Sequence, residues 1–293
     1  MKLGIVFSGG GVKGIAHSGV LKALEEEKIF PEVFTGTSSG SHVAFLSAIG
    51  YSADSIKKTY DENVNKIVGL DKDKCEYDLF DFKKYLIYKN FKIDGLRSGK
   101  VIEDFYKEIG SKNGINNIEE IKKPLGIVAT DLLHEKEVWF TSKKIDVFNV
   151  SKDVINKSDI NIGKAIRASS SFSIMFDPCV IDKDIYLDGG ICNNVPVDLA
   201  RALGADKVIA VVFEDYVEDK NKFKINMFNI GMKTIDVMSK ISSRNNLLNA
   251  DVVVKIKGSL KNLLDVNNSE KYYNDGYIEV KNNIEKIKEI IKK

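Results

Sequence analysis

Cysteine and proline are both scarce in this sequence, and their scarcity excludes several classes of protein. The 293 residues include three cysteines and four prolines. The cysteines, Cys75, Cys179 and Cys192, are odd in number and far apart, and none belongs to a Cys-x-x-Cys or Cys/His ligand pattern. We therefore expect neither a disulfide framework nor a metal site, but three reduced thiols. The low proline content and the lack of biased tracts exclude a linker or a fibrous protein.

Long apolar runs and an excess of one charge are absent as well. No uninterrupted apolar stretch approaches the length of about 18 residues that a membrane-spanning helix requires, and the apolar residues 3–7 are too few for a signal peptide. Lysine and arginine number 44 and aspartate and glutamate 42, so the formal net charge is only +2. A protein that binds nucleic acid would need a clearer basic excess for its phosphate contacts. These absences predict a soluble, cytoplasmic protein that binds no nucleic acid.

Alternating strands and helices form the main pattern of the chain. Hydrophobic residues make up 43% of it, which is enough for a large core and excludes intrinsic disorder. Residues 3–7 and 33–37 are short apolar runs typical of buried parallel strands, and each is followed by a glycine-rich turn and a helical pattern. The alternation predicts a layered α/β fold with a largely parallel sheet. Further strands are expected at residues 125–129, 138–141, 185–187, 207–213 and 251–256.

Two charged segments lie outside this pattern. Residues 52–123 are charged, with helical spacing in places and no clear strand, and we hypothesise that they form a mobile lid. Near the C-terminus, apolar residues with helical spacing stand among five lysines. Such an amphipathic helix could touch an anionic membrane, although docking on the domain is the favoured interpretation.

A Gly-x-Ser-x-Gly pattern, residues 36–40, lies between a predicted strand and a predicted helix. In a nucleophile elbow the chain reverses so tightly that side chains at the positions of Gly36 and Gly40 would collide with their surroundings. The turn would lift the hydroxyl of Ser38 above the sheet edge, at a helix N-terminus that favours developing negative charge. Ser38 is therefore a candidate nucleophile. The alternative is a helix-capping serine in a glycine turn.

A second glycine cluster, Ser-Gly-Gly-Gly-Val-Lys-Gly, follows the first predicted strand. The backbone N–H groups of residues 9–11 could bind an anion, and next to Ser38 they would form an oxyanion hole. The cluster also satisfies the Gly-x-Gly-x-x-Gly fingerprint of dinucleotide-binding proteins through Gly9, Gly11 and Gly14. The acidic residue that this fingerprint requires is only loosely matched by Glu32, which precedes its strand instead of ending it. Both interpretations remain open at this point.

A serine nucleophile needs a general base, and the three histidines do not provide an obvious one. His17 and His42 fall in predicted helices and His134 in a polar turn, and none has the late position of a histidine in the Ser-Asp-His chain order. The remaining candidate is Asp188, which follows a short predicted strand and precedes two glycines. Desolvation would raise its pKa and suit it to accept a proton. From Asp-Gly-Gly alone, an aspartate that caps its own turn is the favoured interpretation.

In combination, the three motifs resemble those of the patatin-like phospholipase family. Residues 9–14 are similar to its glycine-rich oxyanion motif, residues 36–40 to its nucleophile elbow and residues 188–190 to its catalytic-aspartate motif. The similarity extends over residues 2–213. Other segments that look familial are residues 129–131, 165–170, 188–197, 250–251 and 276–277.

The resemblance implies a three-layer α/β/α fold with a central, largely parallel sheet. It also implies a single domain over residues 1–293, in which residues 214–293 complete the part that carries the motifs. The activity would be hydrolysis of lipid carboxyl esters, of the phospholipase A or lysophospholipase type, with no cofactor and with transient contact to a membrane surface. No oligomeric state is implied.

The resemblance assigns a role to each motif. Ser38 would attack the ester carbonyl, and Asp188 would take the proton of its hydroxyl. Backbone N–H groups of Gly9, Gly10 and Gly11 would hold the oxyanion. The supporting motif positions are Lys13, Gly14, Gly36, Gly40, Gly189 and Gly190.

One position departs from the family pattern. Ser173 stands where the family usually has a proline, in a loop expected to shape the acyl pocket.

Two other functions remain as alternatives: a dinucleotide-dependent enzyme, and a non-catalytic lipid-binding protein on the same scaffold. Methionines that could form a soft wall for an acyl chain, or simply fill the core, are Met175, Met227, Met232 and Met238.

Overall fold

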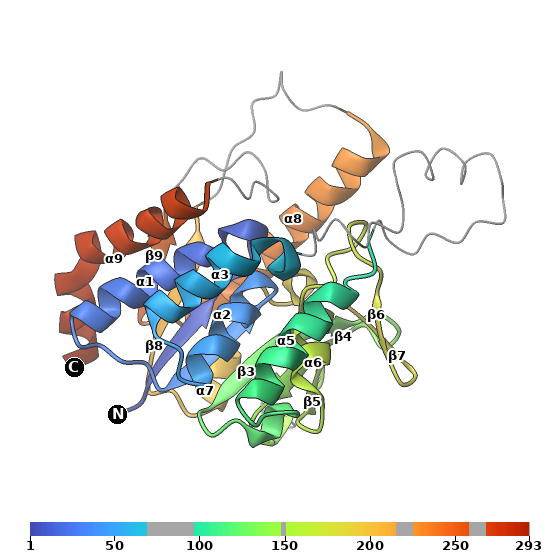
Figure 1. Ribbon diagram of the computed structural model, residues 1–293, viewed down its shortest axis with the longest axis horizontal. Coiled ribbons are helices and arrows are strands. Elements are labelled where there is room, and N and C mark those ends of the chain that lie inside the picture. The colour runs from blue at the N-terminus through green and yellow to red at the C-terminus, as the bar shows by residue number, and fades with distance from the viewer. Residues whose placement is uncertain (69–96, 148–150, 215–224, 258–267, 293) are drawn as a thin grey trace.

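A mostly parallel β-sheet runs through the middle of the molecule, with helices on both of its faces (Figure 1). The computed structural model describes residues 1–68, 97–147, 151–214, 225–257 and 268–292. In these residues the sheet has nine strands, seven of them in the order β5-β4-β3-β2-β1-β8-β9. The strands are β1 (Leu3–Phe7), β2 (Val33–Thr37), β3 (Leu125–Asp131), β4 (Lys136–Thr141), β5 (Val154–Lys157), β6 (Cys179–Ile181), β7 (Asp184–Asp188), β8 (Lys207–Phe213) and β9 (Val252–Ile256).

The parallel part of the sheet is built from β3, β2, β1, β8 and β9, which pair side by side in one direction. Antiparallel pairing occurs where β4 and β7 join β3 and where β6 joins β7. The predicted largely parallel sheet is therefore confirmed. β5 and β6 were not predicted, because each is only three or four residues long and largely half-buried or exposed, so neither forms an apolar run.

Two helical layers of unequal size cover the sheet, which confirms the three-layer α/β/α fold. In β1, Ile5 and Phe7 point into the larger layer and Val6 into the smaller one, as the two-residue repeat of a strand requires. The smaller layer is built around α7. The helices are η1 (Gly11–Gly14), α1 (Ile15–Glu26), α2 (Ser39–Ala48), α3 (Ala53–Ile67), α5 (Lys100–Lys112), η3 (Ile118–Glu120), α6 (Ile162–Ser169), η5 (Gly189–Ile191), α7 (Val197–Ala202), α8 (Met227–Leu247) and α9 (Ser269–Lys292).

The C-terminal amphipathic helix, α9, packs along α1 beside β9 (Figure 1). Its apolar side is buried at Tyr272, Val280 and Ile287. The favoured interpretation, a helix docked on the domain, agrees with this arrangement. Among the described residues, no helix is both long and apolar enough to cross a membrane.

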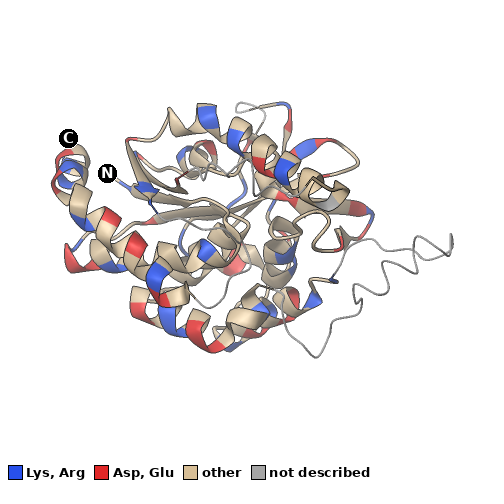
Figure 2. Ribbon diagram, turned by 90° about the horizontal axis from the view of Figure 1, so that it is seen from above, with Lys and Arg blue, Asp and Glu red and all other residues tan. Residues whose placement is uncertain are grey.

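The charged segment 52–123 contains ordinary core-packing helices in its described part. α3 buries Ile56 and Tyr60, and α5 buries Ile102 and Tyr106. Residues 69–96, on which the rest of the lid hypothesis depends, lie outside the described residues, as does Cys75. Cys179 and Cys192 are free thiols, as expected. Figure 2 shows acidic and basic residues interspersed over the helices, in keeping with the balanced composition.

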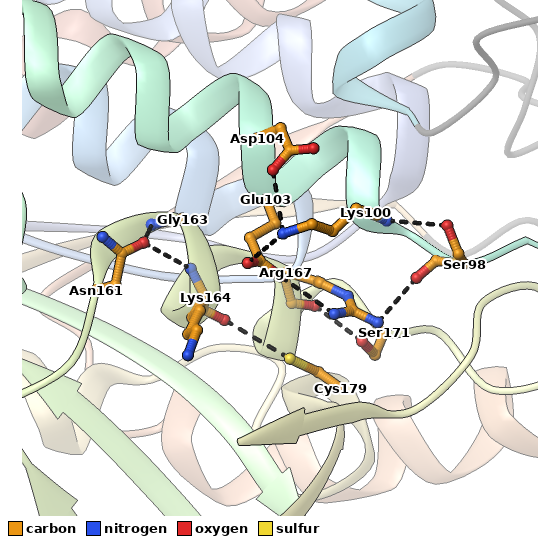
Figure 3. A network of polar contacts seen from close by, with 10 residues as sticks. All are labelled: Ser98, Lys100, Glu103, Asp104, Asn161, Gly163, Lys164, Arg167, Ser171 and Cys179. Carbon is orange, nitrogen blue, oxygen red and sulfur yellow. Dashed lines mark hydrogen bonds and ion pairs between the residues drawn. The ribbon is translucent and has the colours of Figure 1, made fainter. Parts of the chain in front are cut away.

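A buried ion pair fixes α6 against α5 (Figure 3). Arg167 on α6 lies 3.1 Å from Glu103 on α5, and it also donates to the backbone carbonyl of Ser98 at 2.9 Å. Lys100 contacts the other oxygen of Glu103 at 2.7 Å, so the buried carboxylate is neutralised from two sides. Because α6 ends at Ser169, this pair also determines where the serines that follow Arg167 are placed.

Candidate active site

Strands β2 and β7 pair with the same edge of β3 from opposite directions, and their ends meet there. The candidate nucleophile and the candidate base lie where these two strands end. β2 runs parallel to β3 and ends with Thr37 opposite Val128. β7 runs in the opposite direction and ends with Asp188 opposite Ala129, the next residue of β3. The residue after Thr37 is Ser38. The pairing therefore brings Ser38 and Asp188 together although 150 residues separate them in the sequence.

Ser38 occupies a tight turn between β2 and α2. Its φ of 53° and ψ of −127° are unfavourable for a residue with a side chain, and such strain is typical of functional sites. The glycines on either side are required by close approach: a Cβ at Gly36 would lie 2.3 Å from the carbonyl oxygen of Gly40, and one at Gly40 would lie 2.1 Å from that of Phe7. Ser38 does occupy the N-cap position of α2, as the alternative interpretation held, but its side chain makes no capping hydrogen bond.

Asp188 is almost completely buried, with 3% of its surface exposed. Its Oδ1 accepts a hydrogen bond from the N–H of Gly190 at 2.7 Å. Its Oδ2 has no hydrogen bond of ordinary geometry among the described residues. Burial raises the pKa of Asp188 from 3.8 to about 6, while the nearby Ser38 hydroxyl and the N–H of Gly190 favour the charged form and oppose the rise. The aspartate does cap its own turn, but with only one of its two oxygens.

The glycine loop after β1 lies against the same turn. A Cβ at Gly9 would be 3.0 Å from the Cβ of Ser38, so the two backbones are in close contact. The N–H of Gly9 donates to Oδ1 of Asn194 at 2.9 Å. In the described part of the chain, the N–H groups of Gly10 and Gly11 donate no hydrogen bond. Gly10 and Gly11, and not Gly9, therefore have a backbone donor available for an anion.

Asn194 was not singled out from the sequence, where Asn193 and Asn194 indicated only a turn. In the structure its side chain joins two of the three motifs. Its Oδ1 receives the Gly9 hydrogen bond and would lie 3.4 Å from a Cβ at Gly190. A side-chain amide that binds backbone over a separation of 185 residues leaves no local sequence signal.

Hydroxyl groups from β2 hold the loop that follows Asp188. Thr35 Oγ1 donates to the carbonyl of Pro196 at 3.1 Å, and Thr37 Oγ1 donates to that of Asn193 at 2.8 Å. These threonines were not predicted to take part in the site, because a threonine in a β-strand is ordinary.

The serines at the end of α6 hold the site from the other side. Ser169 Oγ accepts a hydrogen bond from the N–H of Ser38 at 2.9 Å, and the carbonyl of Ser171 accepts one from the N–H of Asp188 at 3.0 Å. The backbones of both candidate catalytic residues are thus tied to one short segment. The buried pair of Arg167 with Glu103 anchors that segment (Figure 3).

The histidines make other contacts. His17 Nε2 donates to the carbonyl of Ser8, and burial lowers the His17 pKa to about 4. His42 Nε2 lies 2.8 Å from Ser170 Oγ, and burial lowers its pKa to about 3. His134 is exposed, with Nδ1 2.9 Å from Asp131. Since no described contact joins a histidine to Ser38 or Asp188, structural roles fit all three, as expected from the sequence.

Lys13 lies between the glycine loop and α8. Its Nζ is 5.5 Å from the centre of the Phe213 ring, and that ring packs against Gly10. Burial lowers the pKa of Lys13, and the carboxylate of Asp236 on α8 opposes this effect. Charge support for the glycine loop therefore fits the position of Lys13 better than simple surface exposure does.

Among the residues that the structure describes, little favours a dinucleotide or a metal ion. Glu32 is exposed before β2 begins, at the opposite end of that strand from Ser38, so it does not meet the fingerprint. Asp131, His134 and Asp184 form a three-residue group with possible metal-ligand atoms within 4.8 Å of one another. The ammonium group of Lys157 lies 2.5 Å from Asp184 and already neutralises that carboxylate.

The methionine predictions need correction. Met227 and Met238 are 77% and 45% exposed on α8, so neither fills the core nor lines a buried acyl wall. The cause is the orientation of α8, whose outward face carries them. Met175 packs partly buried against the main core, and Met232 is half-buried.

The loop with Ser173 continues into Ile174, which has a φ of 76°, a strained value for a β-branched residue.

Comparison with known proteins agrees with the three motifs. The model of the family described as patatin-like phospholipase matches residues 5–201. Protein R571 of Acanthamoeba polyphaga mimivirus is 28% identical over 97% of this chain and 94% of its own. The probable lipid hydrolase 463L of Invertebrate iridescent virus 6 is 27% identical over 78% of this chain and 77% of its own. The chain also matches 13% of the mouse patatin-like phospholipase domain-containing protein 6, at 28% identity over 71% of this chain.

The raised pKa of Asp188 predicts that this residue lowers stability at neutral pH. Between about pH 4 and pH 6 the unfolded chain releases a proton that the folded chain retains, so the free energy of unfolding falls as the pH rises. Asp188→Asn removes this penalty while keeping an oxygen for the N–H of Gly190. We expect it to increase the free energy of unfolding at pH 8 by about 2 kcal/mol, and by much less at pH 4. Urea denaturation at both pH values measures the difference; an Asn variant less stable than wild type at pH 8 would contradict it.

Proposed function

The chain belongs to the patatin-like phospholipase family and is a lipid acyl hydrolase, and we propose that it cleaves phospholipid or lysophospholipid esters with Ser38 as nucleophile and Asp188 as general base. The observation that carries this proposal is the meeting of β2 and β7 on β3, which places the two residues at one point. Their separate motifs are each too common to support a mechanism alone.

Attack begins at the Ser38 hydroxyl. Its oxygen forms a bond to the ester carbonyl carbon while Asp188 accepts the hydroxyl proton. Collapse of the tetrahedral intermediate breaks the bond to the alcohol, which leaves with that proton. A water molecule, deprotonated by the same carboxylate, then releases the fatty acid from Ser38. No metal or cofactor is required for any of these steps.

The negative oxygen of the tetrahedral intermediate needs donors that are already in place. The N–H groups of Gly10 and Gly11 are the available donors of the glycine loop, and the contact between Gly9 and Ser38 keeps this loop next to the nucleophile. The amide of Asn194 positions the loop through the N–H of Gly9. We therefore assign the oxyanion hole to residues 10 and 11, with Asn194 as a positioning residue.

The environment of Asp188 suits it to act without a histidine. A carboxylate with a pKa of about 6 is mostly ionised at neutral pH and is still a stronger base than an exposed aspartate. The same role is supported by the Ser38 hydroxyl, which favours the charged form of Asp188, and by the lack of any other partner of ordinary geometry for Oδ2 among the described residues. The strained Ser38 backbone and the unpaired oxygen also argue against a non-catalytic lipid-binding scaffold, in which neither would have a use.

Replacing Ser38 tests the activity and its nucleophile together. Ser38→Ala is expected to lower the rate of fatty acid release from phosphatidylcholine and lysophosphatidylcholine by more than about 10³-fold, because the covalent route is lost. Ser47→Ala, a buried serine later on α2, is the matched control and should keep the wild-type rate. Fatty acid release by Ser38→Ala at the wild-type rate would exclude Ser38 as the nucleophile.

Asn194→Ala tests the positioning of the oxyanion loop. Without its acceptor the N–H of Gly9 is unpaired and the loop can shift, so kcat should fall by about 10- to 100-fold with a small change in KM. Asn194→Asp restores an acceptor and is expected to recover part of the loss. Asn245→Ala, at an exposed position of α8, should have no effect. Equal kcat values for Asn194→Ala and Asn245→Ala would remove Asn194 from the mechanism.

A further inference from the structure

The outward face of α8 is apolar. Five apolar side chains lie on this face. Successive members are three, seven, one and three positions apart in the sequence, which is the spacing of one side of a helix. They are 43% to 77% exposed, and the exposed Leu248 follows directly after the helix. We call these five side chains the α8 stripe: Met227, Ile230, Val237, Met238 and Ile241.

The inward face of α8 carries polar groups that touch the candidate active site, together with Leu247, which packs against the smaller core. Asn246 Nδ2 donates to Asn193 Oδ1 at 2.9 Å, and Ser239 Oγ would lie 3.4 Å from a Cβ at Gly190. Asp236 forms ion pairs with Lys233 and Lys240. A helix that packs on a protein core shows the opposite arrangement, with its apolar face inward. The apolar side that α8 leaves exposed is therefore available to an apolar surface outside the protein.

The charges of α8 indicate the kind of surface. The helix carries three basic residues, Lys233, Lys240 and Arg244, and a single acidic one, Asp236. Asp236 forms ion pairs with Lys233 and Lys240, and the helix keeps a positive net charge. Helical spacing places Lys233 and Arg244 along one edge of the stripe. An apolar stripe with a basic edge is complementary to an anionic lipid surface.

The stripe is also continuous with the rim of the site. A Cβ at Gly231 would lie 2.6 Å from Cδ1 of Ile174, an exposed residue three positions after Ser171. Ser171 in turn binds the backbone of Asp188. A surface bound to α8 would thus lie beside the loop that supports the catalytic base.

We propose that the α8 stripe docks the enzyme on an anionic lipid bilayer and so presents the active site to its substrate. The proposal rests on the lipid hydrolase function given above. A second copy of this chain fits less well, because pairing two stripes would bury Arg244, an exposed charge at the edge of the apolar face, against the partner copy. At a lipid surface, its long side chain can reach the headgroup phosphates.

Vesicle binding by an inactive enzyme tests the proposal independently of hydrolysis. In a Ser38→Ala background, Ile230→Glu with Ile241→Glu is expected to weaken co-sedimentation with phosphatidylcholine/phosphatidylglycerol vesicles by about tenfold or more. Vesicles of phosphatidylcholine alone should bind the parent protein more weakly than the anionic ones. Because both replaced side chains are exposed, thermal unfolding should be unchanged.

Phe30→Glu is the matched control, since Phe30 is 62% exposed before β2 begins, at the opposite end of that strand from Ser38. It should bind anionic vesicles as the parent does. Equal binding by all variants, or no binding by the parent, would overturn the proposal even if wild-type enzyme hydrolyses lipids. A parent dimer that the double substitution dissociates, seen by light scattering, would overturn it in favour of a second copy of the chain. If the parent and its variants bind vesicles as expected but the wild-type enzyme hydrolyses no lipid, only the proposed function is refuted.

Discussion

The shared edge of β3 is the constraint on which the rest of the site depends. β2 uses this edge as far as Val128, and β7 takes over at Ala129 from the opposite direction. The nucleophile turn must therefore leave the sheet where the aspartate arrives. Thr35, Thr37 and the serines that end α6 make hydrogen bonds that fit only this meeting of chain ends. Several features that look like separate motifs in the sequence are consequences of one pairing arrangement.

The site is maintained at a cost to stability. Ser38 holds an unfavourable φ, Asp188 is buried with one oxygen unpaired, and the N–H groups of Gly10 and Gly11 have no partner in the described chain. Each of these would be removed in a chain selected for stability alone. The surrounding sheet, whose central strands are almost fully buried, supplies the packing that tolerates them. The combination of a rigid frame with unsatisfied groups is what a pre-organised hydrolase needs.

The parts of the fold and of the candidate site that depend on local sequence patterns could be predicted. The parts that depend on long-range contacts could not. The central strands and the elbow at Ser38 follow from apolar runs and glycine spacing, which are local properties of the chain. The approach of Asp188 to Ser38 depends on strand pairing over 150 residues, and it could be expected only from resemblance to a family. Asn194 acts through a single long-range hydrogen bond, so no pattern marked it. Met227 and Met238 were expected in an acyl wall or the core because methionine commonly fills apolar sites, whereas the fold leaves both exposed on α8.

The central claim is that a buried Asp188 activates Ser38 directly. Its most direct test is the rate at which a fluorophosphonate probe labels Ser38 as a function of pH, with the labelled residue identified by peptide mass mapping. For wild type the rate should rise with pH and reach half its maximum near pH 6, because only ionised Asp188 can accept the proton. For Asp188→Asn the rate should be low and independent of pH in this range. A wild-type rate that does not change between pH 5 and pH 7, or the same pH profile in Asp188→Asn, would contradict the account.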